Sequence, residues 1–176
     1  MKEANVSIGL TKPKSPSNVG AIMRAAGCYG VKSVFYTGER YDRAAKFNTD
    51  TKDATQNIPL IGVDDLLDCV PHDAKVVCVE LVIGATPLPE FEHPQNAFYL
   101  FGPEDGTLHQ KVIDKADAVV YIPTTGCLNL AATVNVILYD RLAKSPSTIA
   151  SDELIRQSRD AKNKVYIKKH KHQNSL

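Results

Sequence analysis

Short runs of β-branched, aromatic and aliphatic residues recur along the chain and alternate with longer amphipathic stretches. Runs of this length and composition are typical of strands buried in a sheet. The strands that they predict are Asn5–Leu10, Ser33–Thr37, Ile58–Val63, Lys75–Val82, Ala97–Phe101 and Ala118–Ile122. Apolar positions at helical spacing predict helices over Val19–Tyr29, Asp64–Cys69, Leu108–Lys115, Leu128–Ala143 and Asp152–Lys162.

The order of these elements indicates the fold class. Strands followed by helical segments, with little sign of hairpins, predict an α/β domain with a mainly parallel sheet flanked by helices. The polar, poorly periodic stretch Tyr41–Gln56 predicts a surface excursion between the second and third strands. No linker rich in proline, glycine or serine divides the chain, so we expect one domain over residues 1–150, with residues 151–176 as its C-terminal helix and basic tail. The helix over 128–143 is apolar on more than one face and therefore needs burial on several sides, as a central core helix does.

Composition changes this picture little. The chain has 176 residues, 43% of them apolar and 23% charged, which is enough for one domain with a sizeable core. The net charge of +1 gives no overall attraction to polyanions, but Arg156–Lys171 holds seven lysines and arginines against one acid. That local charge fits either a phosphate-binding surface or a solvated C-terminal tail, and charge alone favours the tail.

The four cysteines, Cys28, Cys69, Cys78 and Cys127, form no CxxC pair and stand among apolar or small residues. We expect them to be reduced and mostly buried, as in a cytoplasmic protein. No HExxH motif and no His–Cys ligand spacing occurs, so no metal is expected. The N-terminus lacks the regions of a signal peptide and no apolar run reaches membrane-spanning length, so no membrane association is expected.

Three stretches combine glycine, proline and polar residues at or near predicted strand–helix junctions. They are NVGAIMRAA from Asn18, YLFGPEDGTL from Tyr99 and YIPTTGCLNLAATVNVILYDRL from Tyr121. Ligands of open α/β sheets bind at the carboxyl ends of strands, so the three loops are expected to build one pocket. The sequence has no GxGxxG after the first strand, no GxxxxGKS/T and no GxSxG, so dinucleotide-binding, P-loop and nucleophile-elbow chemistry is not indicated.

The order and wording of the three stretches resemble the signature motifs of the SpoU/TrmH-type RNA methyltransferases, a branch of the SPOUT superfamily. The first motif is an Asn followed six residues later by an Arg, here Asn18 and Arg24. The second is a strand ending in FGxE with a glycine close behind, and the third is a strand ending in Ile-Pro, then a glycine, then Ser-Leu-Asn opening a long helix. The matching residues are Phe101, Gly102, Glu104, Gly106, Ile122, Pro123, Gly126, Leu128 and Asn129. Cys127 departs from the pattern, because the family more often has Ser there and a thiol is a poorer hydrogen-bond partner than a hydroxyl.

The resemblance implies a parallel sheet whose C-terminal part passes through a loop to form a deep trefoil knot. It implies a homodimer with the active site at the subunit interface. It also implies S-adenosylmethionine as cofactor, held in a bent shape largely by backbone groups. The residues expected at the cofactor are Glu80, Leu81, Val82, Phe101, Gly102, Gly106, Ile122, Pro123, Cys127 and Leu128. For Glu80 the alternative is a surface acid.

The activity that the resemblance implies is in-line methyl transfer to a ribose 2′-hydroxyl of tRNA or rRNA. Arg24 is expected to bind the target phosphate and stabilise charge on the ribose oxygen, since a guanidinium keeps its proton far above neutral pH. The proton acceptor stays open between phosphate, water and a transiently neutral Arg24. Asn18 is expected to orient Arg24 or the ribose, and Glu104 to position Arg24 or Asn129. Taken alone, Asn18 also fits a helix N-cap, and Glu104 an acid in a first helical turn.

RNA must also be held. Lys12 and Lys14, just ahead of the first motif, are expected at the mouth of the pocket, and the tail offers further phosphate contacts through Arg156, Arg159, Lys168 and Lys169. Two other functions stay open: a non-catalytic RNA-binding or assembly protein that keeps the knotted dimer, and a methyltransferase acting on a base nitrogen. Retention of the four catalytic candidates, Asn18, Arg24, Glu104 and Asn129, favours an enzyme, and the pairing of Asn18 with Arg24 favours methylation of ribose.

Overall fold

The computed structural model describes residues 4–45, 58–146 and 150–167. The chain divides into two compact units, residues 1–145 and residues 146–176, and the first holds the sheet and the three sequence motifs. The second contains one short helix, α5 (Asp152–Ser158), which is exposed along its length and capped by the hydroxyl of Ser151. None of the helices in these ranges combines the length and hydropathy that a membrane span requires.

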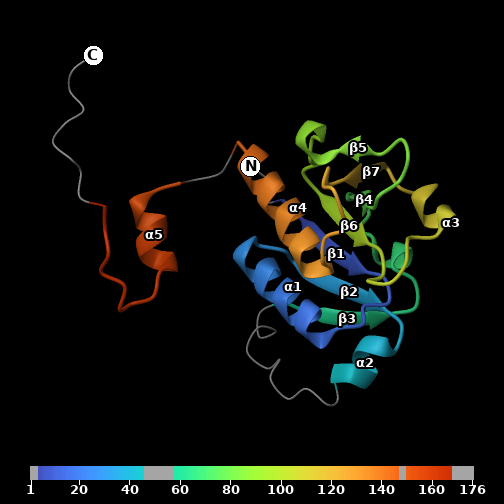
Figure 1. The fold of residues 1–176 in the computed structure, drawn as a ribbon, viewed down its shortest axis with the longest axis horizontal. Coiled ribbons are helices and arrows are strands. Elements are labelled where there is room, and N and C mark those ends of the chain that lie inside the picture. Colours follow the sequence, from blue (N-terminus) through green and yellow to red (C-terminus); the bar gives the residue numbers. More distant parts are fainter. Residues whose placement is uncertain (1–3, 46–57, 147–149, 168–176) are drawn as a thin grey trace. The chain divides into compact units, whose positions relative to one another are not determined.

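The first unit is built on a seven-stranded sheet in which all neighbouring strands are parallel. In chain order the strands are β1 (Val6–Leu10), β2 (Ser33–Thr37), β3 (Leu60–Val63), β4 (Lys75–Val79), β5 (Thr86–Pro87), β6 (Ala97–Phe101) and β7 (Ala118–Tyr121). Their order across the sheet is β3-β2-β1-β6-β4-β7-β5 (Figure 1). The parallel α/β sheet predicted from the sequence is therefore confirmed. The carboxyl ends of its strands share one edge, where ligands of such sheets bind.

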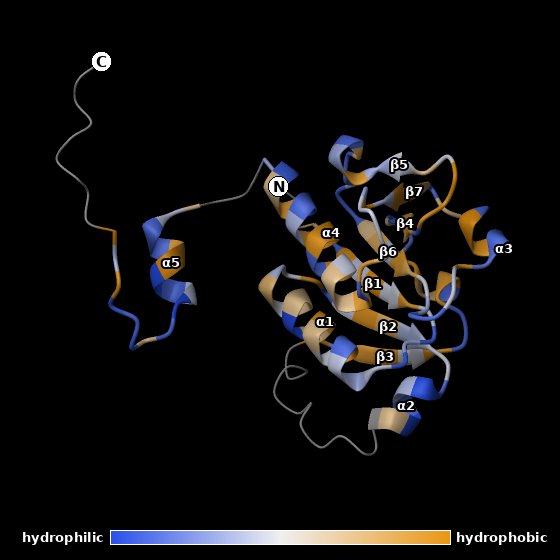
Figure 2. Ribbon diagram, viewed as in Figure 1, coloured by the Kyte–Doolittle hydropathy of each residue, from blue (hydrophilic) through white to orange (hydrophobic). Residues whose placement is uncertain are grey.

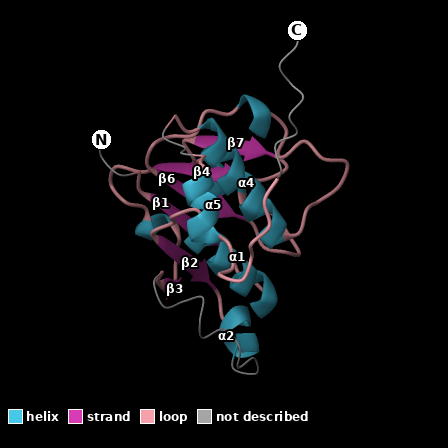
Figure 3. Ribbon diagram, turned by 90° about the vertical axis from the view of Figure 1, so that its left-hand side faces the viewer, coloured by secondary structure: helices cyan, strands magenta, loops and turns pink. Residues whose placement is uncertain are grey.

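Helices cover both faces of this sheet. On one face α1 (Pro16–Cys28) and α4 (Leu130–Lys144) lie side by side, and Figure 3 shows them in front of the strands. The 3-10 turn η1 (Leu67–Cys69) and α3 (Gln110–Ile113) cover the other face. Every position of β1 and β6 is buried, so the central strands are mostly apolar instead of alternating with polar residues (Figure 2).

Alternate side chains of β6 enter two separate cores. Tyr99 and Phe101 pack toward α1 and α4, whereas Phe98 and Leu100 pack toward η1 and α3. Burial of such side chains stabilises the fold by roughly 1.5–3 kcal/mol each. Gly9 of β1 lets the second core close, because a Cβ at this position would lie 2.6 Å from the ring of Phe98.

The sequence pattern does not predict α2 (Arg40–Ala45), which occupies the start of the expected excursion Tyr41–Gln56. Contacts with β2 fix this polar helix. The hydroxyl of Tyr36 donates to Asp42 Oδ1 at 2.6 Å, and the rings of Tyr36 and Tyr41 meet edge-on with centroids 5.1 Å apart. The rest of the excursion, residues 46–57, lies outside the described residues.

Two predicted helices are shorter in the structure because polar side chains bind the backbone in turns. The segment Asp64–Cys69 is helical only at η1, since Asp65 Oδ1 accepts the N–H of Leu67 at 2.9 Å. The helix predicted over Asp152–Lys162 ends with α5, and Asp160 forms a similar turn beyond it. α3 keeps only the middle of its predicted range, and β5 and the 3-10 turn η2 (Leu88–Glu90) have no predicted counterpart.

The cysteines are free, as expected, but the expectation that most are buried is wrong. Only Cys78 is buried, whereas Cys28 and Cys127 are exposed and Cys69 is intermediate. Burial raises the pKa of the Cys78 thiol to about 12. Apolar sequence neighbours misled the expectation, because on a helix they need not share a face: Cys28 lies on the outer side of α1.

Candidate active site

A cavity of about 280 Å³ opens at the carboxyl ends of β4, β6 and β7. Its walls are the residues after β4, the loop 102–107 (the β6 loop), the loop 122–129 (the β7 loop) and the start of α4. The predicted cofactor residues that line it are Glu80, Leu81, Phe101, Gly102, Gly106, Ile122, Cys127 and Leu128. Two others do not: Val82 lies in the turn after β4, and Pro123 is exposed in the β7 loop.

The predicted set omits part of the lining. The additional residues are Val79, Pro103, Tyr121, Thr124, Gly126, Leu130 and Thr133. Val79 and Tyr121 are the last residues of β4 and β7, so the rule that ligands bind at strand ends points to them. Thr133 lies one helical turn after Asn129 and donates from Oγ1 to its carbonyl oxygen at 3.0 Å, so helical spacing points to it as well.

Side chains from all three motifs meet at the rim of this pocket in one chain of hydrogen bonds. Asn18 Nδ2 donates to Glu104 Oε2 at 2.9 Å, and Asn129 Nδ2 donates to Asn18 Oδ1 at 3.0 Å. Asn129 Oδ1 then caps α4 by accepting the N–H of Ala131 at 2.9 Å. Among the motif side chains, the direct partner of Glu104 is therefore Asn18, which in turn links it to Asn129.

The direction of this chain is fixed at both ends. A carboxylate only accepts hydrogen bonds, so Asn18 must turn its amide nitrogen toward Glu104 and its amide oxygen toward Asn129. Asn129 must then donate with its nitrogen, which leaves its oxygen for the N–H groups at the start of α4. If either amide group turned over, so that its oxygen and nitrogen changed places, a hydrogen bond would break.

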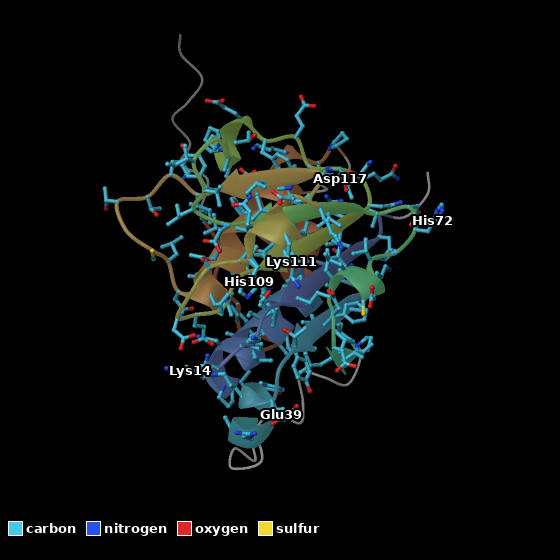
Figure 4. All side chains as sticks on the ribbon, turned by 90° about the vertical axis from the view of Figure 1, so that its right-hand side faces the viewer. Lys14, Glu39, His72, His109, Lys111 and Asp117 are labelled. Atoms are coloured by element: carbon cyan, nitrogen blue, oxygen red, sulfur yellow. The ribbon has the colours of Figure 1, made fainter. Side chains whose placement is uncertain are left out.

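Glu104 also ties the β6 loop to the start of α1. Its Oε1 accepts the N–H groups of Lys14 and Ser15, both at 3.0 Å. Ser15 is the N-cap of α1, and Glu104 belongs to a loop, so the alternatives of an N-cap for Asn18 and a first-turn acid for Glu104 are wrong. Lys12 and Lys14, the predicted RNA contacts, are exposed in the loop that Glu104 holds. Figure 4 shows Lys14 on one side of the molecule, well away from Asp117 at the amino end of β7.

Glu80 joins two backbone segments of the pocket. Its Oε2 accepts the N–H of Leu108 and its Oε1 that of Leu81, both at 3.0 Å. These contacts explain why β4 ends at Val79, earlier than predicted, since a side chain takes the place of a strand partner. A Cβ at Gly102 would lie 2.7 Å from Oε2 and displace it.

Arg24 does not line this pocket. It is exposed on α1, about 9 Å along the helix from Asn18. Among the residues that the structure describes, none forms a hydrogen bond or ion pair with its guanidinium. Within one chain, the fold thus brings together Asn18, Glu104 and Asn129 and leaves Arg24 apart from them.

The exposed sides of α1 and α4 form one surface, here called the α1/α4 face. Its residues are Ser17, Ala21, Arg24 and Cys28 of α1 and Ala132, Val136, Tyr139 and Ala143 of α4. Tyr139 is 62% exposed, although Val134 and Ile137 on the opposite side of α4 are completely buried. Both helices lie on the same face of the sheet, so both exposed sides point away from it. We expected α4 to be buried on several sides, but among the described residues of the first unit it is buried on one side only.

The ionisable residues of the pocket lining are mainly acidic. Glu80 and Glu104 line the cavity, and no lysine or arginine of the described ranges does so. Such a lining favours a ligand that carries positive charge and disfavours a polyphosphate. In the described part of the chain no three His, Cys, Asp or Glu side chains are grouped as a metal site would require.

The predicted RNA contacts of the tail belong to the second unit. Arg156 pairs with Glu153 at 3.2 Å, and Arg159 donates to the carbonyl oxygen of Val165 at 3.3 Å. Lys168 and Lys169 lie outside the described residues.

Known proteins resemble this chain in sequence and in fold. The model of the SpoU rRNA Methylase family matches residues 5–139. The chain is 27% identical over 144 residues to the 23S rRNA (guanosine-2′-O-)-methyltransferase RlmB of Acinetobacter baylyi. This match covers 76% of this chain and 57% of RlmB. It is 26% identical over 190 residues to the tRNA (cytidine-2′-O-)-methyltransferase TrmJ of Methanocaldococcus jannaschii, in a match that covers 93% of this chain and 79% of TrmJ. The AdoMet-bound rRNA methyltransferase structure from Sinorhizobium meliloti matches with a TM-score of 0.65 at 20% identity, over 81% of this chain and 57% of that one.

The extent of these matches limits what each one shows. The chain spans little more than half the length of RlmB and of the Sinorhizobium meliloti protein, and the likeness to the latter concerns the fold. The family match is broader, because residues 5–139 include all three motifs and the whole pocket lining. The chain therefore belongs to the SpoU rRNA Methylase family, as its motifs predict.

Proposed function

We propose that this protein transfers a methyl group from S-adenosylmethionine (AdoMet) to a ribose 2′-hydroxyl of RNA. The observation that carries the proposal is the hydrogen-bonded chain Glu104–Asn18–Asn129, which joins three distant motifs at the rim of a pocket. The relatives RlmB and TrmJ support it, since both are named 2′-O-methyltransferases. One is named for rRNA and the other for tRNA, so the proposed substrate class includes both.

The pocket suits AdoMet in charge and size. AdoMet supplies an electrophilic methyl group, because its sulfur is cationic. The carboxylates of Glu80 and Glu104 favour that charge, and the described lining offers no lysine or arginine for a polyphosphate. A volume of about 280 Å³ is close to the lower end of the range for small-molecule sites.

In this proposal Glu104, Asn18 and Asn129 orient the ribose, and Arg24 stabilises negative charge on the RNA. Glu104 and Asn129 hold the amide of Asn18, whose second N–H has no partner among the described residues and is available to orient the ribose. Arg24 binds the phosphate beside the target ribose and stabilises the negative charge that grows on the 2′-oxygen as its proton leaves. Fixed placement of the hydroxyl supplies much of the remaining acceleration.

The proposed active form is a homodimer in which Arg24 serves the pocket of the second subunit. Two observations support it: Arg24 lies outside its own pocket, and it belongs to the partly apolar α1/α4 face. Pairing of this face with the same face of another copy would bury Val136 and Tyr139 of both subunits.

A trefoil knot is part of the proposed fold. Its support is the course of the chain after β7: the β7 loop lines the pocket beside the β6 loop, and α4 then packs on α1. At the end of α4, Lys144 Nζ donates to the carbonyl oxygens of Leu88 and Phe91, at 2.6 and 3.1 Å. In a trefoil knot the C-terminal part of the chain passes through a loop formed earlier in the sequence, and it would follow such a course.

Lysines and arginines at the surface are proposed to hold the RNA. Lys12 and Lys14 lie in the loop that Glu104 ties to the pocket rim, and Arg156 and Arg159 of the second unit add further phosphate contacts. Contacts of this kind give affinity without reading bases. The proposed location is the cytoplasm, where the four free cysteines stay reduced.

The test of the activity is transfer of labelled methyl from AdoMet to total RNA, followed by nucleoside analysis. We expect labelled 2′-O-methylnucleoside from the wild type, and a rate lower by about 100-fold or more for Arg24→Ala, because one stabilising donor is removed. The AdoMet affinity of this variant should not change, and Arg43→Gln serves as a charge-matched control. Equal label from wild type and Arg24→Ala would remove Arg24 from the mechanism. A labelled base would indicate the base-nitrogen reaction, and AdoMet-independent RNA binding without label would indicate the non-catalytic alternative.

A mixing experiment tests whether the site is shared between subunits. We expect Arg24→Ala and Asn129→Ala subunits to have strongly reduced activity alone, but in a mixed dimer one pocket has an intact Asn129 and receives an intact Arg24. Random mixing should therefore restore about a quarter of the wild-type rate. If both residues act within one chain, mixing restores nothing.

A further inference from the structure

Arg40 and Asp105 form a two-pronged ion pair that joins α2 to the β6 loop. Arg40 Nη1 donates to Asp105 Oδ1 at 2.9 Å, and Nη2 donates to Oδ2 at 2.7 Å. A planar guanidinium that meets a carboxylate through two parallel bonds fixes the direction of the contact as well as its length. Neither residue lines the pocket.

The arginine end of the pair is firmly anchored. Arg40 is the first residue of α2, directly before Tyr41, which is only 7% exposed. Tyr36 of β2 holds this short helix through its ring contact with Tyr41 and its hydrogen bond to Asp42. The guanidinium therefore extends from an element that is tied to the sheet.

The aspartate end lies at the most exposed part of the pocket wall. Asp105 stands between Glu104 and Gly106, which both line the cavity. Residues 104–107 are all exposed, so burial does not hold them in place. Side-chain contacts do so instead: Glu104 reaches the start of α1, and Asp105 reaches α2.

We propose that Arg40 is a positioning residue which, through Asp105, holds the β6 loop so that Glu104 stays bonded to Asn18 and Gly106 stays at the cofactor. Its effect on cofactor affinity rests on the proposed function, whereas its effect on the order of the loop does not. The two side chains are 43% and 49% exposed, and such pairs add little to global stability, so the effect is local. The guanidinium lowers the pKa of Asp105 to about 2, so the pair stays ionised throughout the neutral range.

The test compares Arg40→Gln with Arg43→Gln, a matched control from the same helix whose arginine pairs with Glu39 instead of the β6 loop. We expect Arg40→Gln to speed hydrogen–deuterium exchange in peptides covering residues 102–108, with an unchanged melting temperature. The Kd for AdoMet should rise about five-fold. Asp105→Asn should reproduce both effects, the double variant should add nothing, and Arg40→Lys should restore part of them.

Three outcomes would overturn the inference. One is unchanged exchange in the β6 loop of both Arg40→Gln and Asp105→Asn, and another is an equal effect in Arg43→Gln. The third is a normal AdoMet affinity with weakened RNA binding only, which would make Arg40 a phosphate contact. If the wild type binds no AdoMet, the proposed function fails, but the exchange measurement still decides whether the pair orders the loop.

Discussion

Asn18 and Asn129 present their amides at the pocket rim in an order that Glu104 sets. The order matters because an amide has one accepting and one donating end, whereas a carboxylate only accepts. Three side chains thus behave as one unit, although each is a common residue in a short motif. At this scale, the identity of a single atom decides whether the unit forms.

Glu104→Gln tests this dependence on a single atom. The glutamine oxygen can still accept from Lys14 and Ser15, but its NH₂ group then faces the Asn18 nitrogen, so Asn18 must turn over and lose Asn129. The loss of a charge-assisted hydrogen bond corresponds to about 1.5–3 kcal/mol, so we expect kcat/KM to fall by about 10- to 100-fold.

The control for this variant is Glu92→Gln, at an exposed glutamate outside the pocket lining. It should retain the wild-type rate. A Glu104→Gln enzyme that is folded and fully active would show that the orientation of the Asn18 and Asn129 amides does not affect the reaction.

At the scale of elements, α4 is held by polar contacts at both ends. Asn129 caps its start, and near its end Arg141 donates to the carbonyl oxygens of Pro94 and Gln95, both at 2.6 Å. Beside this end lies His93, whose side chain is only 4% exposed. Its Nδ1 meets the Tyr99 hydroxyl at 2.6 Å and its Nε2 meets Asp140 Oδ2 at 2.9 Å.

This setting makes stability depend on the protonation of His93. Burial lowers its pKa below the usual 6.5, with Arg141 and Lys144 adding to the effect and Asp140 opposing it. The unfolded chain therefore takes up a proton at a higher pH than the folded chain does. Stability from the neutral ring is complete above pH 6.5 and is lost as the pH falls through the lower folded-state pKa.

Urea unfolding between pH 5 and pH 8 measures this effect. We expect the wild type to lose stability toward pH 5 and His93→Gln to lose much less, with a cost of about 1–3 kcal/mol at pH 8 from the altered buried contacts. His72→Gln, at an exposed histidine, should behave as the wild type. Parallel pH profiles for wild type and His93→Gln would exclude His93 as the cause.

At the scale of the whole molecule, the chain separates its proposed tasks between two units. The cavity is formed entirely by residues 79–133 of the first unit, whereas the sequence of the second unit holds seven lysines and arginines against three acids. Cofactor binding should therefore be independent of the tail, and RNA binding should not be.

Removal of residues 163–176 tests this separation. We expect weaker RNA binding and an unchanged Kd for AdoMet. In a plot of log K against log salt concentration, the slope should become shallower by about 0.7–0.9 for each phosphate that the shortened protein no longer neutralises. RNA affinity that is the same as for the full chain at every salt concentration would exclude the tail from RNA binding.

Much of this organisation could be predicted from the sequence, for reasons that differ between features. Apolar runs such as Ala97–Phe101 show where buried strands lie, because burial on both faces requires apolar residues throughout. Asn18, Glu104 and Asn129 could be found because each belongs to a short motif with fixed spacing. Of the two acids in the pocket, Glu104 belongs to such a motif, whereas Glu80 lies outside all three.

Other features depend on contacts that the sequence pattern does not show. The position of β6 between β1 and β4 follows from how the connections cross the sheet, and apolar runs carry no record of that path. α2 has no apolar stripe and is fixed by Tyr36, and Arg40 meets Asp105 across 65 positions of sequence. The exposed side of α4 could not be assigned either, because its apolar residues resemble those of a core helix.

The acidic lining of the pocket has a consequence for turnover. Methyl transfer converts a sulfonium into a neutral thioether, so the ligand leaves the reaction with one positive charge fewer than it brought. In the proposed reaction, Glu80 and Glu104 would therefore attract the fresh cofactor more strongly than the spent one. A pocket of this charge would favour the exchange of spent cofactor for fresh cofactor, because the reaction itself weakens the electrostatic attraction.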